Sequence, residues 1–181
     1  NVAMNSILAQ TLGTCTCSSY RAPFLKVMTS MALRDDMESG ESYFIVEIKS
    51  LKRILEESKK PEPLLCIIDE VLRGTNTIER IAASSQILAS LHQNWVLPFA
   101  ATHDIELSYI LEDLYDNYHF EEEVKEKEVV FSYILKKGRA TSRNAIRLLD
   151  MLEYDPKIVE GAAKAARDFE EKGVWESLKP V

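Results

Sequence analysis

A short apolar run that ends in two carboxylates constrains this chain more than any other feature of its sequence. Residues 64–68 read Leu-Leu-Cys-Ile-Ile, and Asp69 and Glu70 follow directly. An apolar run of this length is typical of a central strand of a parallel sheet, covered on both faces. The two acidic residues then lie at the carboxyl end of the strand, which is the edge where α/β sheets bind ligands. Many strands end in acidic residues that only begin a solvated loop, so the interpretation depends on the residues around the motif.

The segments on either side of this run alternate between strand and helix patterns. Residues 24–32 form a candidate strand, and residues 96–101 are predicted to form a second buried strand. Between residues 78 and 88 a helix is expected, followed by a short helix over 104–113. A further helix from Ser42 has an apolar face formed by Phe44, Ile48, Leu51 and Leu55. Strands and helices in this order indicate a doubly wound α/β fold.

The two ends of the chain carry different patterns. Residues 2–12 are predicted to form a buried helix that ends at Gly13, and the first charged residue is Arg21. An uncharged opening segment is typical of a core helix, so we expect that further sequence precedes it in the complete protein. Residues 117–135 indicate an antiparallel hairpin, and two helices are expected over residues 141–152 and from Asp155-Pro156 to about residue 172.

Composition excludes several classes of protein. With 181 residues, 46% of them apolar, the chain can bury a core, and its net charge of −7 argues against binding nucleic acid over its whole surface. The longest apolar runs, 64–68 and 95–101, are much shorter than the roughly 20 residues that span a bilayer, so no membrane partner is expected. Three cysteines without disulfide-like spacing favour a reducing compartment, and we expect a cytoplasmic protein.

Two neighbouring segments place further polar residues at the same edge of the predicted sheet. Asn76 follows the acidic motif and, with Glu79 three residues later, is a plausible helix N-cap. His103 ends the next strand, where it can hydrogen-bond a terminal phosphate or help to cap the helix that follows. Phosphoryl-transfer sites use a carboxylate to hold Mg²⁺ and a neighbouring base to orient the attacking water. Asp69 fits the first role and Glu70 the second.

These motifs, taken in order, resemble the ATPase domain of the MutS mismatch-repair family. The resemblance is carried by residues 69–77 (Asp-Glu-Val-Leu-Arg-Gly-Thr-Asn-Thr) and by Ala101-Thr102-His103. Residues 34–47 look like the signature loop and helix of that family, and residues 117–120 and 138–144 stand in the expected order. The resemblance covers nearly the whole chain. It implies a P-loop NTPase (ABC-like) fold, in which helices flank a mixed sheet, with an antiparallel hairpin and C-terminal helices.

The resemblance also implies roles for individual residues. Asp69 would hold Mg²⁺, Glu70 would activate water, and His103 would sense the γ-phosphate of ATP. Two ATPase domains of this family form composite sites, so Ser39, Gly40 and Ser42 would contact the partner's nucleotide in a homodimer. Asn76 is also predicted to bind the nucleotide. DNA would be engaged through other domains of the full-length protein.

Residues 1–150 are accordingly predicted to form the ATPase core, and residues 151–181 a helical segment that can contribute to dimerisation. The segment has an apolar stripe for this purpose, formed by Ile158, Ala162, Ala165 and Phe169. Trp175 and Leu178 either extend the stripe or fold back on their own domain. A basic cluster is either a solvated surface or a contact with the partner or with DNA; it contains Lys136, Lys137, Arg139, Arg143 and Arg147.

The chain departs from the family pattern in three respects. It contains no Gly-x-x-x-x-Gly-Lys-Ser/Thr phosphate-binding loop, so these 181 residues alone are expected to be inactive as an ATPase. Tyr43, Leu72, Asn76 and residues 78–80 differ from the residues usual in mismatch-recognising members, which suggests a divergent MutS-like subgroup. No mismatch-reading domain is present in these residues.

Two other functions remain open from the sequence. The chain could be a noncatalytic dimerisation or interaction module that retains the ATPase fold. It could also belong to another ABC-like ATPase of chromosome maintenance, although such a protein would carry a Leu-Ser-Gly-Gly string where this chain has Glu38-Ser39-Gly40-Glu41.

Overall fold

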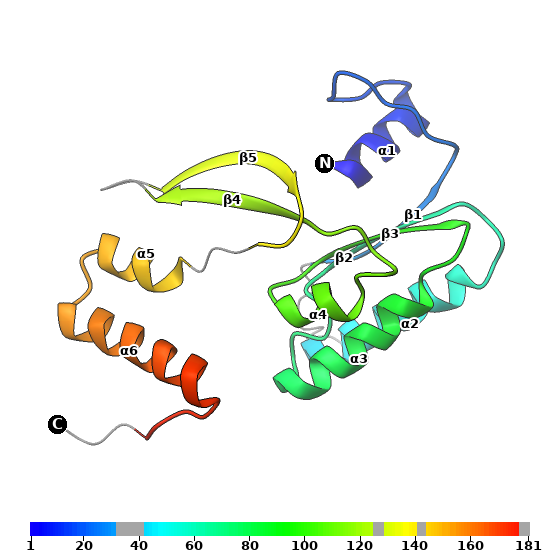
Figure 1. Cartoon of the computed structure of the whole chain (residues 1–181). Helices are drawn as coiled ribbons and strands as arrows, with labels where there is room; N and C mark the ends of the chain where they lie inside the picture. The colour runs from blue at the N-terminus through cyan, green and yellow to red at the C-terminus, as the bar shows by residue number, and fades with distance from the viewer. Residues whose placement is uncertain (32–41, 125–128, 141–143, 178–181) are drawn as a thin grey trace. The chain divides into compact units, whose positions relative to one another are not determined.

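A computed structural model describes residues 1–31, 42–124, 129–140 and 144–177. The chain divides into two compact units, Asn1–Asp116 and Asn117–Val181, and each is considered by itself. The first contains α1 (Val2–Leu12), β1 (Lys26–Ser30), α2 (Tyr43–Ser58), β2 (Leu64–Asp69), α3 (Thr77–Ser90), β3 (Val96–Ala101) and α4 (Ile105–Ile110). The second contains β4 (Tyr118–Val124), β5 (Val129–Lys137), α5 (Ala145–Met151) and α6 (Pro156–Lys172) (Figure 1). The functional division predicted at residue 150 remains a prediction.

The first unit is built on a parallel sheet with the strand order β1-β2-β3. The apolar run at residues 64–68 therefore belongs to the central strand, as predicted. β2 and β3 pair in register from Leu64 opposite Val96 to Asp69 opposite Ala101. Because the two strands run level to their last residues, the loops that follow them leave the sheet side by side. The predicted mixed α/β class is confirmed, with the antiparallel pair β4-β5 forming a separate sheet.

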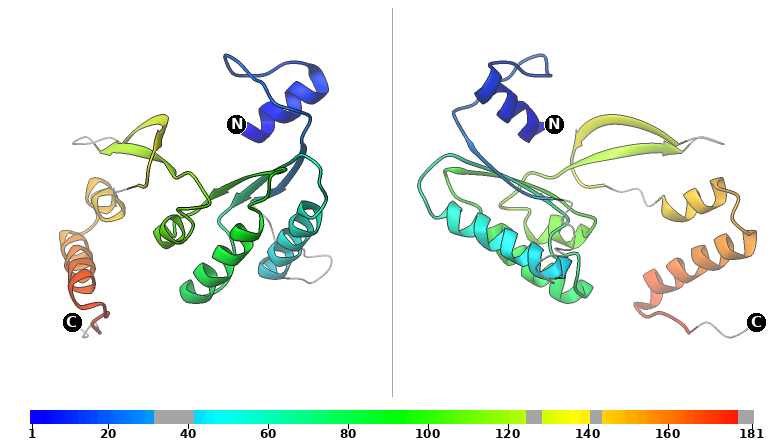
Figure 2. Two further views of the ribbon diagram at one scale, coloured as in Figure 1. Left: turned by 45° about the vertical axis from the view of Figure 1, so that its right-hand side comes forward. Right: turned by 180° about the vertical axis from the view of Figure 1, so that it is seen from behind.

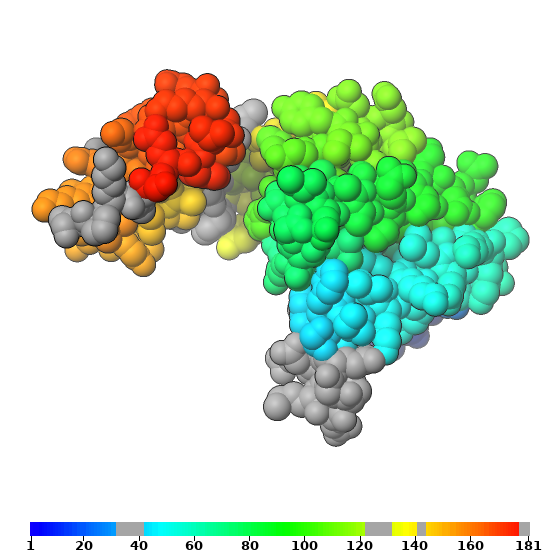
Figure 3. All heavy atoms as spheres, turned by 90° about the horizontal axis from the view of Figure 1, so that it is seen from below, coloured from blue at the N-terminus to red at the C-terminus, as the bar shows by residue number. Residues whose placement is uncertain are grey.

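Helices α2, α3 and α4 lie on one face of the parallel sheet, and α1 lies on the other side (Figure 2). Seen from below, the surfaces of α2 and α3 adjoin each other (Figure 3). Alternate residues of β2 pack into the core on this helical face, which also receives side chains from α2 and α3; the shared cluster includes Leu51, Ile54, Leu64, Cys66, Ile68 and Leu88. Both crossover helices lie on the same face, so the described strands do not show the two-sided helical cover that a doubly wound sheet has.

The interpretation of residues 96–101 as a buried strand was wrong for most of its length. Val96 is 9% exposed, whereas Leu97 and Phe99 are 49% and 41% exposed. Successive side chains of a strand point to opposite faces. Val96 therefore joins the core under the helices, while Leu97 and Phe99 belong to the opposite face. Helix α1 contacts that side of the unit at β1 and does not shield these two side chains.

Helix α1 has the predicted bounds and ends at Gly13 in the left-handed conformation, but it is not the apolar core helix that was predicted. Its buried residues are the polar Asn5 and Ser6, whereas Leu12 is 72% exposed. Asn5 Oδ1 accepts a hydrogen bond from the Thr16 amide at 2.6 Å, and Ser6 Oγ accepts one from the Tyr20 hydroxyl at 2.9 Å. The helix thus packs its polar positions against the loop that follows it.

Helix α2 buries a stripe displaced from the predicted apolar face. Ile48 is 40% exposed, and Leu55 is only partly buried. The buried residues are Glu47, Leu51, Ile54 and Ser58, spaced by four, three and four residues along the helix. An acidic residue, Glu47, therefore lies in the core. The sequence pattern did not predict a buried carboxylate in this helix.

The predicted helix caps are confirmed in both units. Asn76 Oδ1 accepts a hydrogen bond from the Glu79 amide at 3.0 Å at the start of α3, and Asp155 Oδ1 accepts one from the Lys157 amide at 2.9 Å at the start of α6. The second unit continues with an antiparallel β4-β5 hairpin, as predicted. Trp175 folds back on its own helix and stacks on Phe169 with ring centroids 4.2 Å apart.

Within the described ranges, no helix combines the length and the apolar character needed to cross a bilayer.

Candidate functional site

The carboxyl edge of β2 and β3 brings three predicted site residues together. Asp69 is the last residue of β2 and is exposed. Glu70 follows in the left-handed conformation with φ +53°, and its amide donates to the Ala101 carbonyl at 2.9 Å. This bond continues the pairing of the strands for one residue while the chain turns. The turn directs the Glu70 side chain toward the loop that follows β3, where His103 lies.

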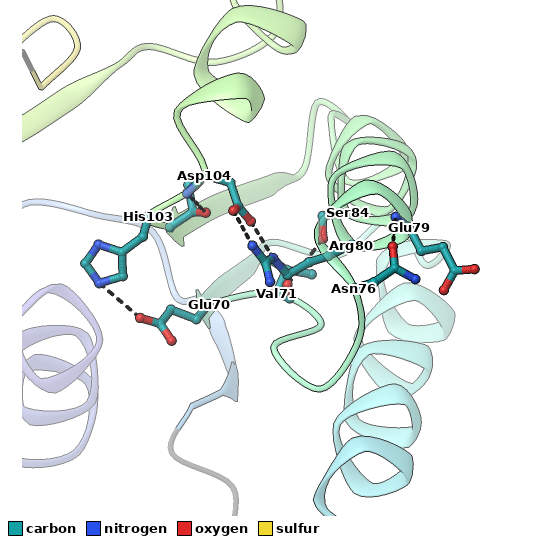
Figure 4. Close-up of polar contacts among 9 residues, drawn as sticks. Glu70, Val71, Asn76, Glu79, Arg80, Ser84, His103 and Asp104 are labelled. Atoms are coloured by element: carbon teal, nitrogen blue, oxygen red, sulfur yellow. Dashed lines mark hydrogen bonds and ion pairs between the residues drawn. The ribbon is translucent and has the colours of Figure 1, made fainter. Parts of the chain in front are cut away.

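The Glu70 carboxylate has a partner at each oxygen. Oε1 lies 3.1 Å from His103 Nε2, and Oε2 pairs with the guanidinium of Arg73. Figure 4 shows the Glu70 and His103 side chains pointing toward each other. The His103 side chain is 93% exposed, whereas that of Glu70 is 24% exposed. A partly buried carboxylate beside an imidazole and a cation can orient a water molecule and accept its proton.

A hollow of about 150 Å³ opens beside this pair. It is lined by Glu70, Val71, Arg73, Arg80, Thr102, His103 and Asp104. Two guanidinium groups, two carboxylates and an imidazole line this space. The guanidinium groups of Arg73 and Arg80 pair with the carboxylates of Glu70 and Asp104, so an anionic ligand would compete with those carboxylates for its donors.

Arg80 and Asp104 form a two-pronged ion pair that supports the loop carrying His103. Arg80 Nε donates to Asp104 Oδ2 at 2.7 Å, and Arg80 Nη2 donates to Oδ1 at 2.6 Å. The hydrogen bonds that Arg80 donates to the Asp104 carboxylate raise the pKa of the guanidinium above its ordinary value. The Asp104 amide in turn donates to Thr102 Oγ1 at 3.0 Å. The loop between β3 and α4 is thereby tied to α3 on one side of His103.

The predicted nucleotide-binding residues do not all join this site. Asn76 is absent from the lining of the hollow, and its side-chain oxygen caps α3 on the far side of Arg80 from the Glu70–His103 pair (Figure 4). Ser42 is the N-cap residue of α2, and its carbonyl accepts from the Ile45 amide at 3.0 Å. Its side chain makes no cap hydrogen bond. Ser39 and Gly40 lie outside the described residues.

The potential of this edge to hold a metal ion depends on the carboxylate of Asp69. Among the described residues, no group of three or more histidine, cysteine, aspartate or glutamate side chains could hold a metal ion. Asp69 nevertheless offers an exposed carboxylate at the end of β2. Mg²⁺ is commonly held by one or two carboxylates together with substrate phosphates. The residues present therefore fit a Mg²⁺ ion that arrives with a nucleotide, and they do not fit an all-protein metal centre.

The structure adds residues that the sequence analysis did not assign to the site. Arg80 and Asp104 line the hollow from different elements, and no pattern in the sequence indicates that they pair. Tyr43 lies near the site at the start of α2; burial, and then the charge of Glu47, raises the pKa of its phenol. Glu47 could have been noticed, because it stands three residues after Phe44 and four before Leu51, on a stripe that is otherwise apolar.

Comparison with known proteins identifies the family of this chain. Residues 1–170 match the family model described as MutS domain V. The DNA mismatch repair protein MutS of Aquifex pyrophilus is 31% identical over 98% of this chain and 21% of its own length. The proteins of the same name from Leptospira interrogans and Bacillus licheniformis are 32% and 30% identical over 94% and 93% of this chain. This chain spans about a fifth of the length of each of these relatives. It belongs to the MutS domain V family.

Proposed function

We propose that this chain is the ATPase part of a MutS-like DNA-repair or recombination protein, which binds and hydrolyses MgATP to drive the engagement of DNA. The proposal includes a P-loop, ABC-like fold for the complete domain and membership of a divergent subgroup. DNA would be contacted through other parts of the complete protein. The three free cysteines, Cys15, Cys17 and Cys66, support a cytoplasmic location.

One observation carries this proposal: Glu70 and His103 meet at the carboxyl edge of two adjacent parallel strands, with Oε1 and Nε2 3.1 Å apart, and Asp69 is the last residue of one of these strands. A helix cap or a solvated loop would not require three such groups at one edge. Hydrolysis of the β–γ phosphoanhydride bond of ATP needs a group that orients water and donors that meet the charge on the transferred phosphoryl group. Both kinds of group line the hollow beside Glu70.

Each side chain then has a distinct task. Asp69 would hold Mg²⁺, which when bound neutralises charge on the phosphate oxygens. Glu70 orients the attacking water and accepts its proton, and for this its carboxylate must exchange a present partner for water. His103 donates a hydrogen bond to the terminal phosphate. Asn76 is proposed to reach the nucleotide through its side-chain nitrogen, because its oxygen caps α3.

The remaining assignments concern a second protomer. Ser39, Gly40 and Ser42 are proposed to contact the nucleotide of the partner in a homodimer. Residues 151–181 are proposed to help the two copies associate, through the half-buried stripe that includes Ala162, Ala165 and Phe169.

The test is the substitution Glu70→Gln in the complete gene product that contains this chain. Steady-state MgATP turnover is expected to fall about 100-fold or more, because the amide cannot accept a proton from water. Binding of a fluorescent ATP analogue is expected to remain, since Asp69 and His103 are unchanged. The matched control is Glu62→Gln, an exposed carboxylate in the loop before β2 that should leave turnover as it is.

Turnover near that of the wild type in Glu70→Gln would contradict the proposal. The 181 residues alone contain no phosphate-binding loop sequence and are expected to show no measurable turnover. If the complete gene product neither binds nor hydrolyses ATP but still forms dimers, the chain is instead a noncatalytic dimerisation module.

A further inference from the structure

The turn that carries Glu70 is strained. Residues 70–76, here called the β2–α3 turn, contain two non-glycine residues in the left-handed conformation, Glu70 with φ +53° and Leu72 with φ +57°. L-residues other than glycine, asparagine and aspartate rarely adopt this conformation, because Cβ approaches the following carbonyl oxygen. Such a turn persists only when surrounding groups hold it. The groups that hold it therefore decide where the Glu70 carboxylate points.

Helix α2 supplies the strongest of these contacts through Glu47. Glu47 Oε1 accepts a hydrogen bond from the Leu72 amide at 2.5 Å, and the Arg73 amide also donates to this carboxylate. The contact joins residues 25 positions apart in the chain. It fixes the backbone at the second left-handed residue, two positions after Glu70.

Two further contacts enclose the same turn. The Ser84 hydroxyl of α3 donates to the Val71 carbonyl at 3.3 Å, a contact drawn in Figure 4. Gly74 lies so close to Phe44 of α2 that an added Cβ would stand 2.8 Å from Phe44 Cδ2. Helix α2 thus contacts the β2–α3 turn through Glu47 and through Phe44. Of these two residues, Glu47 is the one that accepts hydrogen bonds from backbone amides of the turn.

Burying the carboxylate of Glu47 costs free energy, which a merely structural role does not explain. The residue is 3% exposed, and its Oε2 atom has no hydrogen-bond partner within the described part of the chain. Burial raises the pKa of this carboxyl, and the amides of Leu72 and Arg73 oppose the shift. An apolar side chain of similar size would avoid the burial of an unpartnered oxygen, but it would leave the two turn amides without their acceptor.

We propose that Glu47 is a positioning residue for Glu70: by accepting the amides of the β2–α3 turn, it holds the turn in the left-handed conformation that aims the Glu70 carboxylate at the reacting water. This inference rests on the proposed ATPase function. Asp69 lies before the turn, on β2, so the loss of Glu47 leaves the Mg²⁺-holding carboxylate in place. The effect of Glu47 is therefore expected in the chemical step and not in nucleotide binding.

The experiment compares Glu47→Met with Glu47→Gln in the complete gene product. Methionine fills a similar volume but accepts no strong hydrogen bond, whereas glutamine retains a carbonyl oxygen that can accept both amides. We expect Glu47→Met to lower kcat for MgATP about 10- to 100-fold, the size of effect that a misplaced catalytic group produces. Its KM should change less than about threefold, and Glu47→Gln should keep kcat within about threefold of the wild type.

A second measurement detects the turn without nucleotide. Hydrogen–deuterium exchange of peptides covering residues 70–76 is expected to accelerate at least about tenfold in Glu47→Met and to remain slow in Glu47→Gln. Peptides covering β2 serve as the internal reference. The matched control is Ser58→Ala, a buried residue of the same helix whose hydroxyl donates to the Leu55 carbonyl within α2. It should change neither kcat nor exchange of the turn.

The proposal is overturned if Glu47→Met keeps kcat within about twofold of the wild type, if its turn exchanges no faster, or if Glu47→Gln loses as much turnover as Glu47→Met. Wild-type turnover in Glu70→Gln would be a different result. It would remove the proposed ATPase function and the catalytic consequence of Glu47 with it. Faster exchange in Glu47→Met would then still support Glu47 as the anchor of the turn.

Discussion

The two units of this chain treat their apolar side chains in different ways. In residues 1–116, Ile54, Leu65 and Leu91 are each 0% exposed, and the core cluster lies entirely within this unit. In the second unit, α5 and α6 contain no fully buried residue, and Tyr133 and Trp175 are 82% and 68% exposed. A parallel sheet can connect its strands only through crossover helices, and these cover a face of the sheet and enclose a core. A hairpin followed by two helices carries no such requirement.

The difference explains where the candidate site lies. Asp69 ends strand β2, and Glu70 and His103 stand on the loops that follow β2 and β3, strands that are packed in the first unit. The second unit is held mainly by local contacts, such as the Asp155 cap of α6 and the stack of Trp175 on Phe169. Paired substitutions, one in each unit, can therefore test whether the two units differ in packing.

The largest expected effect comes from truncating one isoleucine in each unit of the 181-residue chain. Ile54→Ala should lower the free energy of unfolding by about 2–5 kcal/mol, because a fully buried side chain leaves a cavity. Ile158→Ala, at a position 53% exposed, should lower it by less than about 1 kcal/mol. Urea unfolding followed by circular dichroism measures both. Equal losses would show that the second unit is packed as tightly as the first.

The second-largest difference is expected when one ion pair is removed from each unit and the loss of unfolding free energy is compared. Asp104→Ala removes both acceptors of Arg80, whose side chain is only 23% exposed, and should cost about 1.5–3 kcal/mol of unfolding free energy. Glu176→Ala removes the partner of Lys172 in the second unit, where both side chains are about half exposed. Solvent screens that pair, so no change in the unfolding midpoint is expected. A resolved shift in Glu176→Ala would contradict this view of the second unit.

Two glycines should respond in opposite directions. Gly74→Ala would place a Cβ 2.8 Å from Phe44 Cδ2, and the forced movement should destabilise the first unit by about 1–3 kcal/mol. Gly161 stands inside α6 with open space around its Cα. Gly161→Ala should therefore raise stability by about 0.5–1 kcal/mol through helix propensity. Thermal unfolding checks both signs, and destabilisation by Gly161→Ala would show that a neighbour occupies that space.

The smallest effect concerns pH and the second unit alone. His119 Nε2 lies 3.0 Å from Glu121 Oε1, and its Nδ1 lies 2.9 Å from the Gly138 carbonyl. The hydrogen bond with Glu121, and then that with Gly138, raise the pKa of His119 above 6.5. The resulting stabilisation is fully present below the unfolded pKa of about 6.5 and is lost as the pH rises through the folded pKa.

The titration of the His119 ring in NMR spectra measures this shift. Glu121→Gln should move the pKa of His119 down toward 6.5, because the amide no longer favours the charged ring. Glu160→Gln, which removes an exposed carboxylate from α6, should leave the titration unchanged. If Glu121→Gln does not lower the pKa, the pair does not control this imidazole.

Features determined by neighbouring residues could be predicted from the sequence. The run at 64–68 and the two carboxylates after it identify a central strand and its edge, because an uninterrupted apolar run needs cover on both faces. Asn76 and Asp155 were predicted as caps because a short polar side chain reaches the amide two or three residues ahead without help from the rest of the fold. The placement of His103 at the same edge as Glu70 followed from the rule that adjacent parallel strands end at one edge, whereas the pairing of the two side chains was not predicted.

Features determined by distant residues could not be predicted in the same way. The helical period places both Phe44-Ile48-Leu51-Leu55 and Glu47-Leu51-Ile54-Ser58 on a continuous stripe, and the sequence pattern favoured the more apolar of the two. The sheet and α3 select the second, although Phe44 and Leu55 still pack against the core at its margin. For α1, similarly, the loop that follows the helix decides that Asn5 and Ser6 face inward.

The sequence alone predicts the strand that ends in Asp69 and Glu70, the order of strands and helices around it, and the caps that begin α3 and α6. These depend on side chains within a few positions of one another. Two contacts could be seen in the tertiary structure but not predicted. Glu47 accepts a hydrogen bond from the turn after Glu70, and Arg80 pairs with Asp104. Those contacts join residues 25 and 24 positions apart, and they form only after the crossover helices have packed on the sheet.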